Sequence, residues 1–234
     1  MSRKIFNPAE GHPYYFLGAV LALLAMLYPI LGIGRWGLVI WTLSFWVVLV
    51  AAIHATGRRR RVRTSARWLG STALIAGIVG LGQILAYGES TSAVRIIVDV
   101  LTLVFLMFAT GAVLFEVLTT KRVDVDHLIG ASASYVLLGL TFTYAFLALQ
   151  EVTGDAILIS RVALQGQTIT DPGLADFLYF SFVSLTTLGF GDIVPITMGA
   201  RVLTTVEAIA GQLFLTILVA RLIGLHIADS RVSH

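Results

Sequence analysis

The sequence contains no cysteine and few charged residues. The absence of cysteine from all 234 residues excludes disulfides and metal sites built from thiolates. Asp, Glu, Lys and Arg together make up 12% of the chain, about half the share that is usual in soluble domains. Hydrophobic residues make up 57%, and the mean hydropathy is +0.90. A soluble fold of this size cannot bury so much apolar surface, so the composition argues against a water-soluble enzyme.

Long apolar runs predict an all-α membrane protein with six transmembrane helices. About 20 mostly apolar residues are needed to cross the hydrocarbon core, and lipid cannot satisfy loose backbone groups there. We place the six helices at about 14–33, 36–56, 68–87, 93–118, 128–150 and 200–225. A shorter apolar stretch, at about 174–187, would reach only ~21 Å as a helix. It is too short to span a bilayer, which predicts a re-entrant or buried helix.

Lysine and arginine are distributed unequally between the two sides of these helices. Twelve of the 16 fall on one side, which includes both ends of the chain and the loops around 57–67 and 119–127. Positive charge concentrates on the cytoplasmic side of membrane proteins. We therefore predict a multi-pass protein of the plasma membrane, in a bacterium the inner membrane, with both termini in the cytoplasm and the loop 151–199 outside.

The short apolar stretch ends in an unusual string, Ser184-Leu185-Thr186-Thr187-Leu188-Gly189-Phe190-Gly191-Asp192. This string resembles the selectivity-filter signature of the potassium channel superfamily, whose common form is Thr-Thr-Val-Gly-Tyr-Gly-Asp. Leu188 and Phe190 are the two departures from that form. The resemblance covers residues 128–225, and it implies a four-helix membrane domain at 1–127 followed by a pore domain at 128–234. The pore domain would contain an outer helix, a re-entrant pore helix, the filter and an inner helix.

The chemistry of the string agrees with this resemblance. A dehydrated cation needs a ring of carbonyl oxygens in place of its water. Glycines at alternate positions adopt left-handed backbone angles at no steric cost, so that successive carbonyls can face one axis. We expect K⁺ to bind the carbonyls of Thr187, Leu188, Gly189 and Phe190, in a filter that Gly191 completes. The Thr187 hydroxyl can add an inner ligand, and no cofactor is expected beyond the permeant potassium ions. One filter strand per chain implies a homotetramer.

Four further residues are candidates for supporting the filter. We expect the Tyr179 hydroxyl to donate to Asp192, with a solvated Asp192 at the pore mouth as the alternative. Glu207 is an acid well inside a predicted transmembrane helix, which marks it as a functional candidate. It can form a brace behind the filter by bonding to a hydroxyl such as that of Thr186, or it can sense pH or ions.

The last apolar run contains candidates for the inner gate and the cavity. Gly211 matches a glycine that is often called a gating hinge in the resembled family, although close packing against the pore helix explains a glycine equally well. The proline kink of that family is missing, because Leu218-Val219-Ala220 stands in its place. We expect Gln212, Leu215 and Val219 to line the cavity.

The first four predicted helices lack the charges of a voltage sensor. Moving one charge through 100 mV is worth about 2.3 kcal/mol, so sensors carry several arginines at every third position. The run at 93–118 offers Arg95 alone, with Asp99 one turn later as a partner for a local ion pair. We therefore expect weak or absent voltage gating.

A cluster of basic residues lies beside the membrane after the second predicted helix. It comprises Arg58, Arg59, Arg60, Arg61 and Arg63. Anionic headgroups attract such clusters by about 1 kcal/mol per residue, so the cluster either anchors the topology or makes gating depend on lipid. Nucleic-acid binding is not expected for so short a loop at a lipid surface.

The leading interpretation is a passive, homotetrameric potassium-selective channel that is not an enzyme. A weakly selective monovalent cation channel is the alternative if Leu188 and Phe190 loosen the filter. A potassium-uptake transporter fits less well, because such proteins typically carry four divergent repeats, each with a single filter glycine, whereas this chain has one complete Gly-Phe-Gly string.

Overall fold

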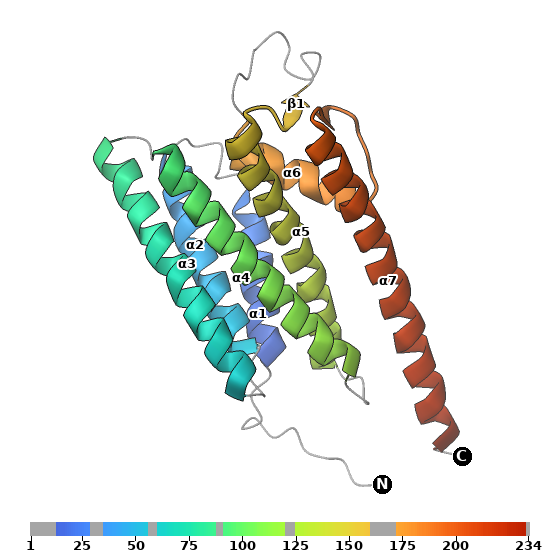
Figure 1. Cartoon of the computed structure of the whole chain (residues 1–234). Coiled ribbons are helices and arrows are strands. Elements are labelled where there is room, and N and C mark those ends of the chain that lie inside the picture. Colours follow the sequence, from blue (N-terminus) through green and yellow to red (C-terminus); the bar gives the residue numbers. More distant parts are fainter. Residues whose placement is uncertain are drawn as a thin grey trace.

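The computed structural model describes residues 13–28, 35–55, 60–87, 91–119, 125–159 and 172–232. This part of the chain forms seven helices and two short strands (Figure 1). The helices are α1 (Pro13–Met26), α2 (Arg35–Ala55), α3 (Arg60–Tyr87), α4 (Ser92–Thr119), α5 (Val125–Thr153), α6 (Leu174–Leu185) and α7 (Met198–Val232). The strands are β1 (Ile157–Ile159) and β2 (Ile193–Pro195).

Five of the helices form a bundle in which consecutive members run in opposite directions. Figure 1 shows α1 to α5 side by side, with the short α6 crossing near the end of the bundle where β1 lies. The long α7 descends from that same end and leaves the bundle at an angle. Four helical segments are long and apolar enough to cross a membrane, namely Thr64–Tyr87, Ser92–Thr119, Val125–Thr153 and Met198–Arg221. The apolar stretches of α1 and α2 are shorter.

The first helix is shorter than the sequence predicts. We expected it to extend from about residue 14 to 33, whereas α1 ends at Met26 and Leu27 enters a turn. Pro29 follows shortly, and a proline disfavours helical geometry in the residue before it and removes a backbone donor. Residues 29–34 lie outside the described residues. The 14 residues of α1 reach about 21 Å, less than the thickness of the hydrocarbon core.

One apolar core joins the bundle to α6. Leu17 of α1, Phe105 of α4 and Leu137 of α5 are fully buried in it, and Leu178 of α6 belongs to the same cluster. A buried contact of 3.3 Å between the hydroxyls of Thr110 (α4) and Thr141 (α5) adds a polar link. The core therefore holds α1 to α5 together and supports α6 from one side.

A second apolar cluster fixes the end of the bundle at which α6 lies. Phe146 of α5 packs against Phe177 and Phe180 of α6, together with Ala200 of α7. Beside it, β1 pairs with β2 in antiparallel register, with Ile157 opposite Pro195. Because β1 follows α5 and β2 precedes α7, this small sheet ties together the two ends of the long connection between those helices.

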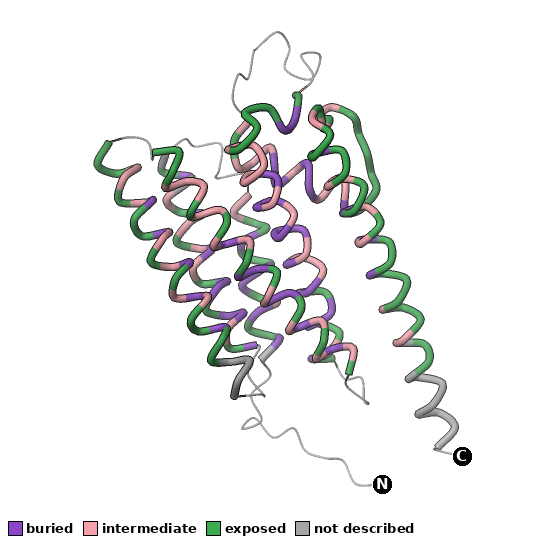
Figure 2. Tube along the Cα trace, in the orientation of Figure 1, coloured by how far each residue is buried: buried purple, intermediate pink, exposed green. Residues whose placement is uncertain are grey.

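Most of α7 has an apolar surface that no other described element of the chain covers (Figure 2). Exposed fractions of 50–55% are found for Val206, Ile209, Leu213, Ile217 and Ile223. A helix with so much exposed apolar surface is stable only against lipid or against another protein surface. We therefore expect the exposed face of α7 to contact lipid or another protein chain.

The basic cluster lies mostly outside the described side chains. Arg58 and Arg59 are outside the described residues, and Arg60, Arg61 and Arg63 are described only as backbone in the first turns of α3. Lipid binding by this cluster therefore stays a prediction.

The alternating directions of the helices predict which residues lie on opposite sides of the membrane. The chain has no cysteine, so single cysteines label cleanly. In intact cells, we expect an impermeant maleimide to label Asp155→Cys, at the β1 end of the bundle. Thr119→Cys, at the other end of α4, should react only after permeabilisation, because the arginine distribution places that end in the cytoplasm. Labelling of both from outside would contradict this topology.

Candidate functional site

The loop that follows α6 is positioned by a short, well-capped helix. The Gly173 N–H donates to Asp176 Oδ2 at 2.8 Å, which satisfies one free donor at the start of α6. The helix has 12 residues and ends at Leu185, two residues before the predicted end. Asp171, which precedes Pro172 just before this helix, lies outside the described residues. A helix of this length reaches about 18 Å, so the loop begins part-way across any membrane that α7 spans.

The backbone of the loop alternates in hand, which means that the sign of φ changes from each residue to the next. Thr187, Gly189 and Gly191 have φ values of +59°, +58° and +79°, whereas the residues between them have negative φ. In an ordinary strand successive carbonyls point to opposite sides, and reversing the sign of φ at every second residue turns them to the same side. The geometry therefore allows the carbonyls of residues 187–190 to face one axis.

Of the three residues with positive φ, two are glycines, for which the sequence predicts such an angle, and one is a threonine, for which it does not. A Cβ built on Gly189 or Gly191 would meet no atom within 4 Å, so the backbone angle and not crowding requires glycine there. Thr187 is the one non-glycine with positive φ among the described residues. A β-branched side chain is strained in this region, and such strain persists only where neighbouring contacts hold it. Nothing in the residue type predicts this conformation.

Asp192 fixes the far end of the loop. The hydrogen bond expected from Tyr179 is present, with the hydroxyl donating to Asp192 Oδ2 at 2.8 Å. The other carboxylate oxygen accepts the Ile193 N–H at 3.1 Å. The rings of Tyr179 and Phe190 stack with centroids 6.5 Å apart and planes 5° from parallel. The far end of the loop is thus tied back to α6 by one polar and one aromatic contact.

Glu207 is completely buried, but its partner is not the one the sequence suggested. Its Oε1 lies 2.6 Å from the Ser181 hydroxyl, which also lies 2.8 Å from the Gly139 carbonyl. Thr186 instead donates to the Phe182 carbonyl of its own helix at 2.6 Å. The reason is position: Thr186 is the exposed C-cap of α6, whereas Ser181 is buried where α5, α6 and α7 meet.

The contact between Ser181 and Glu207 joins three helices at one buried point. One hydroxyl has a single proton, so both contacts of Ser181 are satisfied when Glu207 carries a proton of its own. The second carboxyl oxygen, Oε2, is buried without a hydrogen-bond partner among the described residues. Sequence reasoning identified Glu207 but missed Ser181, because a serine in an apolar helix carries no distinguishing local signal.

The Leu185 carbonyl, at the end of α6, is held by α5 and α7. The Tyr135 hydroxyl donates to it at 3.2 Å. A Cβ on Gly211 would lie 2.2 Å from the same oxygen, closer than any side chain tolerates. Close packing therefore explains Gly211 directly, while its role as a hinge stays a prediction. Tyr135 was not recognised from the sequence.

Gln212, the next residue of α7, reaches the inner end of the loop. Its Nε2 donates to Thr187 Oγ1 at 3.1 Å, and that hydroxyl donates to the Thr186 carbonyl at 2.7 Å. Leu215 and Val219, three and seven residues further along α7, are exposed and share its side of the helix. The three predicted cavity residues thus share one face of α7, and their role in lining a cavity stays a prediction.

Comparison with known proteins gives one match. Residues 134–226 match the model of a family described as "ion channel". This match indicates an ion channel and not an enzyme. It begins within α5, contains α6, the loop and most of α7, and leaves α1 to α4 outside. The comparisons with curated proteins and with solved structures found no match. The family match and the four apolar helices together indicate an integral membrane protein.

Replacing Gly211 with alanine tests the packing between α7 and α6. We expect Gly211→Ala to lower the stability of the channel by about 1–3 kcal/mol, because the new methyl group displaces the backbone of Leu185. Gly224→Ala in the same helix is the control, since its Cβ would meet no atom within 4 Å. Thermal unfolding in detergent measures both. Equal unfolding temperatures for the two variants would contradict the packing role of Gly211 and favour its role as a hinge.

Removing one hydroxyl tests the attachment of Asp192. Tyr179→Phe keeps the ring but deletes the 2.8 Å bond, which should cost about 1 kcal/mol. Tyr87→Phe is the matched control, because Tyr87 is 82% exposed at the end of α3. The same thermal measurement should separate the two variants, and no difference between them would show that the bond does not support the fold.

Proposed function

We propose that the protein is a homotetrameric, potassium-selective channel that conducts ions passively and without a cofactor. One observation carries this proposal: a loop of alternating hand at 187–191 follows the C-terminal end of a short helix. The alternation can present a column of carbonyl oxygens, which is the ligand type that replaces the hydration shell of K⁺. The partial negative charge at the end of α6 also favours a cation beside Thr187.

The exposure of the loop supports assembly around a common axis. In the single chain Leu188 is 60% exposed and Phe190 is 65% exposed, although both are large and apolar. One strand contributes only part of a ring of oxygens, so closing the ring requires further copies with cyclic symmetry. Four copies would cover these side chains and part of the apolar surface of α7.

We infer six membrane spans, with α1 and α2 as the two short members. The five helices of the bundle and α7 alternate in direction, which supports an even number of crossings with both termini on one side. Because arginine and lysine concentrate on that side, we propose that it is the cytoplasm, in a bacterial inner membrane or its equivalent. The basic cluster would then meet the anionic lipids of the inner leaflet.

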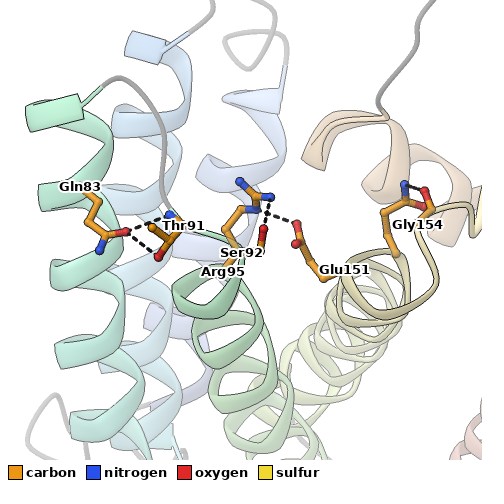
Figure 3. Close-up of polar contacts among 7 residues, drawn as sticks. Gln83, Thr91, Ser92, Arg95, Glu151 and Gly154 are labelled. Carbon is orange, nitrogen blue, oxygen red and sulfur yellow. Dashed lines mark hydrogen bonds and ion pairs between the residues drawn. The ribbon is translucent and has the colours of Figure 1, made fainter.

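Weak or absent voltage gating is part of the proposal. Arg95 is the one arginine of α4, and its Nε forms an ion pair of 2.8 Å with Glu151 of α5 (Figure 3). We expected Asp99 as its partner, and the ion pair with Glu151 was not foreseen. A single, paired charge per subunit supplies about 9 kcal/mol per 100 mV over four subunits at most, far below what arginine-rich helices supply.

A weakly selective cation channel is the second candidate. Leu188 and Phe190 are the observations that favour it, because side chains behind the filter help to set how rigidly the carbonyls are held. The two candidates differ in their response to sodium and not in their architecture.

Purified protein in planar bilayers, with potassium on one side and sodium on the other, tests the function. We expect a reversal potential close to the equilibrium potential of potassium. A reversal potential near zero would favour the weakly selective channel. Gly189→Ala should abolish or strongly reduce the current, because alanine disfavours a φ of +58° by about 1 kcal/mol in each of four copies.

Gly82→Ala in α3 is the matched control for that variant. Its Cβ would also meet no atom within 4 Å, and Gly82 has no left-handed angle. It should therefore conduct like the parent channel. Unchanged current in Gly189→Ala would remove the assignment of this loop as a filter.

A further inference from the structure

A cavity of about 390 Å³ lies between the four-helix domain and the first helices of the pore domain, away from the loop at 187–191. Helices α2, α3, α4 and α5 line it, and the start of α6 closes one end. Its volume falls within the roughly 300–1,000 Å³ of small-molecule sites, which are mostly apolar and carry a few polar groups. The aromatic part of the lining consists of Phe45, Trp46, Tyr144 and Phe177.

The charged groups of the cavity gather near the outer ends of α4 and α5. Figure 3 shows Arg95 reaching from α4 toward Glu151 near the end of α5. The Arg95 Nε lies 2.8 Å from Glu151 Oε1, and its Nη2 lies 3.4 Å from the Ser92 hydroxyl. The guanidinium is therefore neutralised by Glu151, and this pair adds no net charge to the cavity.

Asp99 lies one turn further along α4 and lines the same cavity. It has no hydrogen bond or ion pair with another residue in the described part of the chain, although Arg95 and Glu151 act on it from a longer distance. The described cluster thus contains two carboxyl groups and one guanidinium, which gives an excess of one negative charge when both carboxyl groups are ionised. A carboxylate that lines a mostly apolar cavity is costly to keep ionised without a partner.

We propose that this cavity binds a small amphipathic organic cation, with Asp99 as the counter-ion of its ammonium group. The ammonium would pair with the carboxylate near the mouth, and the faces of Trp46 and Phe45 suit both the cation and an apolar body. Gly77 of α3 leaves room for the Trp46 ring, because a Cβ at that position would lie 3.0 Å from Trp46 Nε1.

Occupancy of the cavity would affect the pore domain as well. Gly173 and Leu174, at the start of α6, line the same cavity as Asp99. A bound cation therefore contacts both the four-helix domain and the helix that positions the loop. This arrangement makes the cavity a site through which a ligand can change the channel from outside the pore.

Calorimetric titration of the purified full-length protein in neutral detergent and high potassium tests the proposal. The probes are 2-phenylethylammonium, the neutral 3-phenyl-1-propanol and the anionic 3-phenylpropionate. We expect the ammonium probe to bind tightest. Asp99→Asn should weaken its binding by about tenfold or more, because the variant removes the charge while keeping the shape. Asp99→Glu should retain most of the affinity.

Glu116→Gln is the matched control, an acid-to-amide change near the other end of α4, and it should bind the ammonium probe like the parent. Equal affinities for the ammonium and neutral probes would overturn the proposal by showing a purely apolar cavity. Tighter binding of the anion would overturn it in favour of Arg95. Binding that Asp99→Asn leaves unchanged would place the probe elsewhere. None of these outcomes depends on whether the pore selects potassium.

Discussion

In the proposed function, the structure depends on one constraint: a cation that gives up its water needs oxygen ligands held at fixed positions. In the proposed function these ligands are backbone carbonyls, because a backbone of alternating hand can point several of them the same way. The chain provides this backbone in five residues, of which Thr187, Gly189 and Gly191 are left-handed. Left-handed threonine is unfavourable on its own, so the surrounding helices have to hold the loop in place.

Side-chain hydroxyl groups do much of that holding. Ser181 joins α6 to α5 and to Glu207 of α7, Tyr135 holds the end of α6, and Tyr179 holds Asp192 beyond the loop. Each contact fixes a different part of α6 and its loop, and Gly211 lets α7 approach the helix end more closely than any other residue would allow. Helix α7, which carries Glu207 and Gly211, continues beyond the bundle with an exposed apolar surface. The position of the loop is therefore linked to the lipid or protein that covers α7.

The sequence predicted the features that depend on local chemistry. Apolar length located the helices, the glycine spacing marked the left-handed positions 189 and 191, and the hydroxyl of Tyr179 met Asp192 as expected. What it missed depends on tertiary contact. The ion pair of Arg95 with Glu151 joins residues 56 positions apart, and local spacing favoured the neighbouring Asp99 instead. The early end of α1 is a local miss: the long apolar run favoured a longer helix, and the single proline after it was given too little weight.

Thermal unfolding of the purified protein in potassium and in sodium, at equal ionic strength, tests the central claim most directly. A ring of carbonyls selective for K⁺ stabilises the folded assembly by mass action as it fills. The account predicts that the unfolding temperature rises with potassium concentration and saturates, whereas sodium has a much smaller effect. Identical unfolding curves in the two salts at every concentration would contradict it.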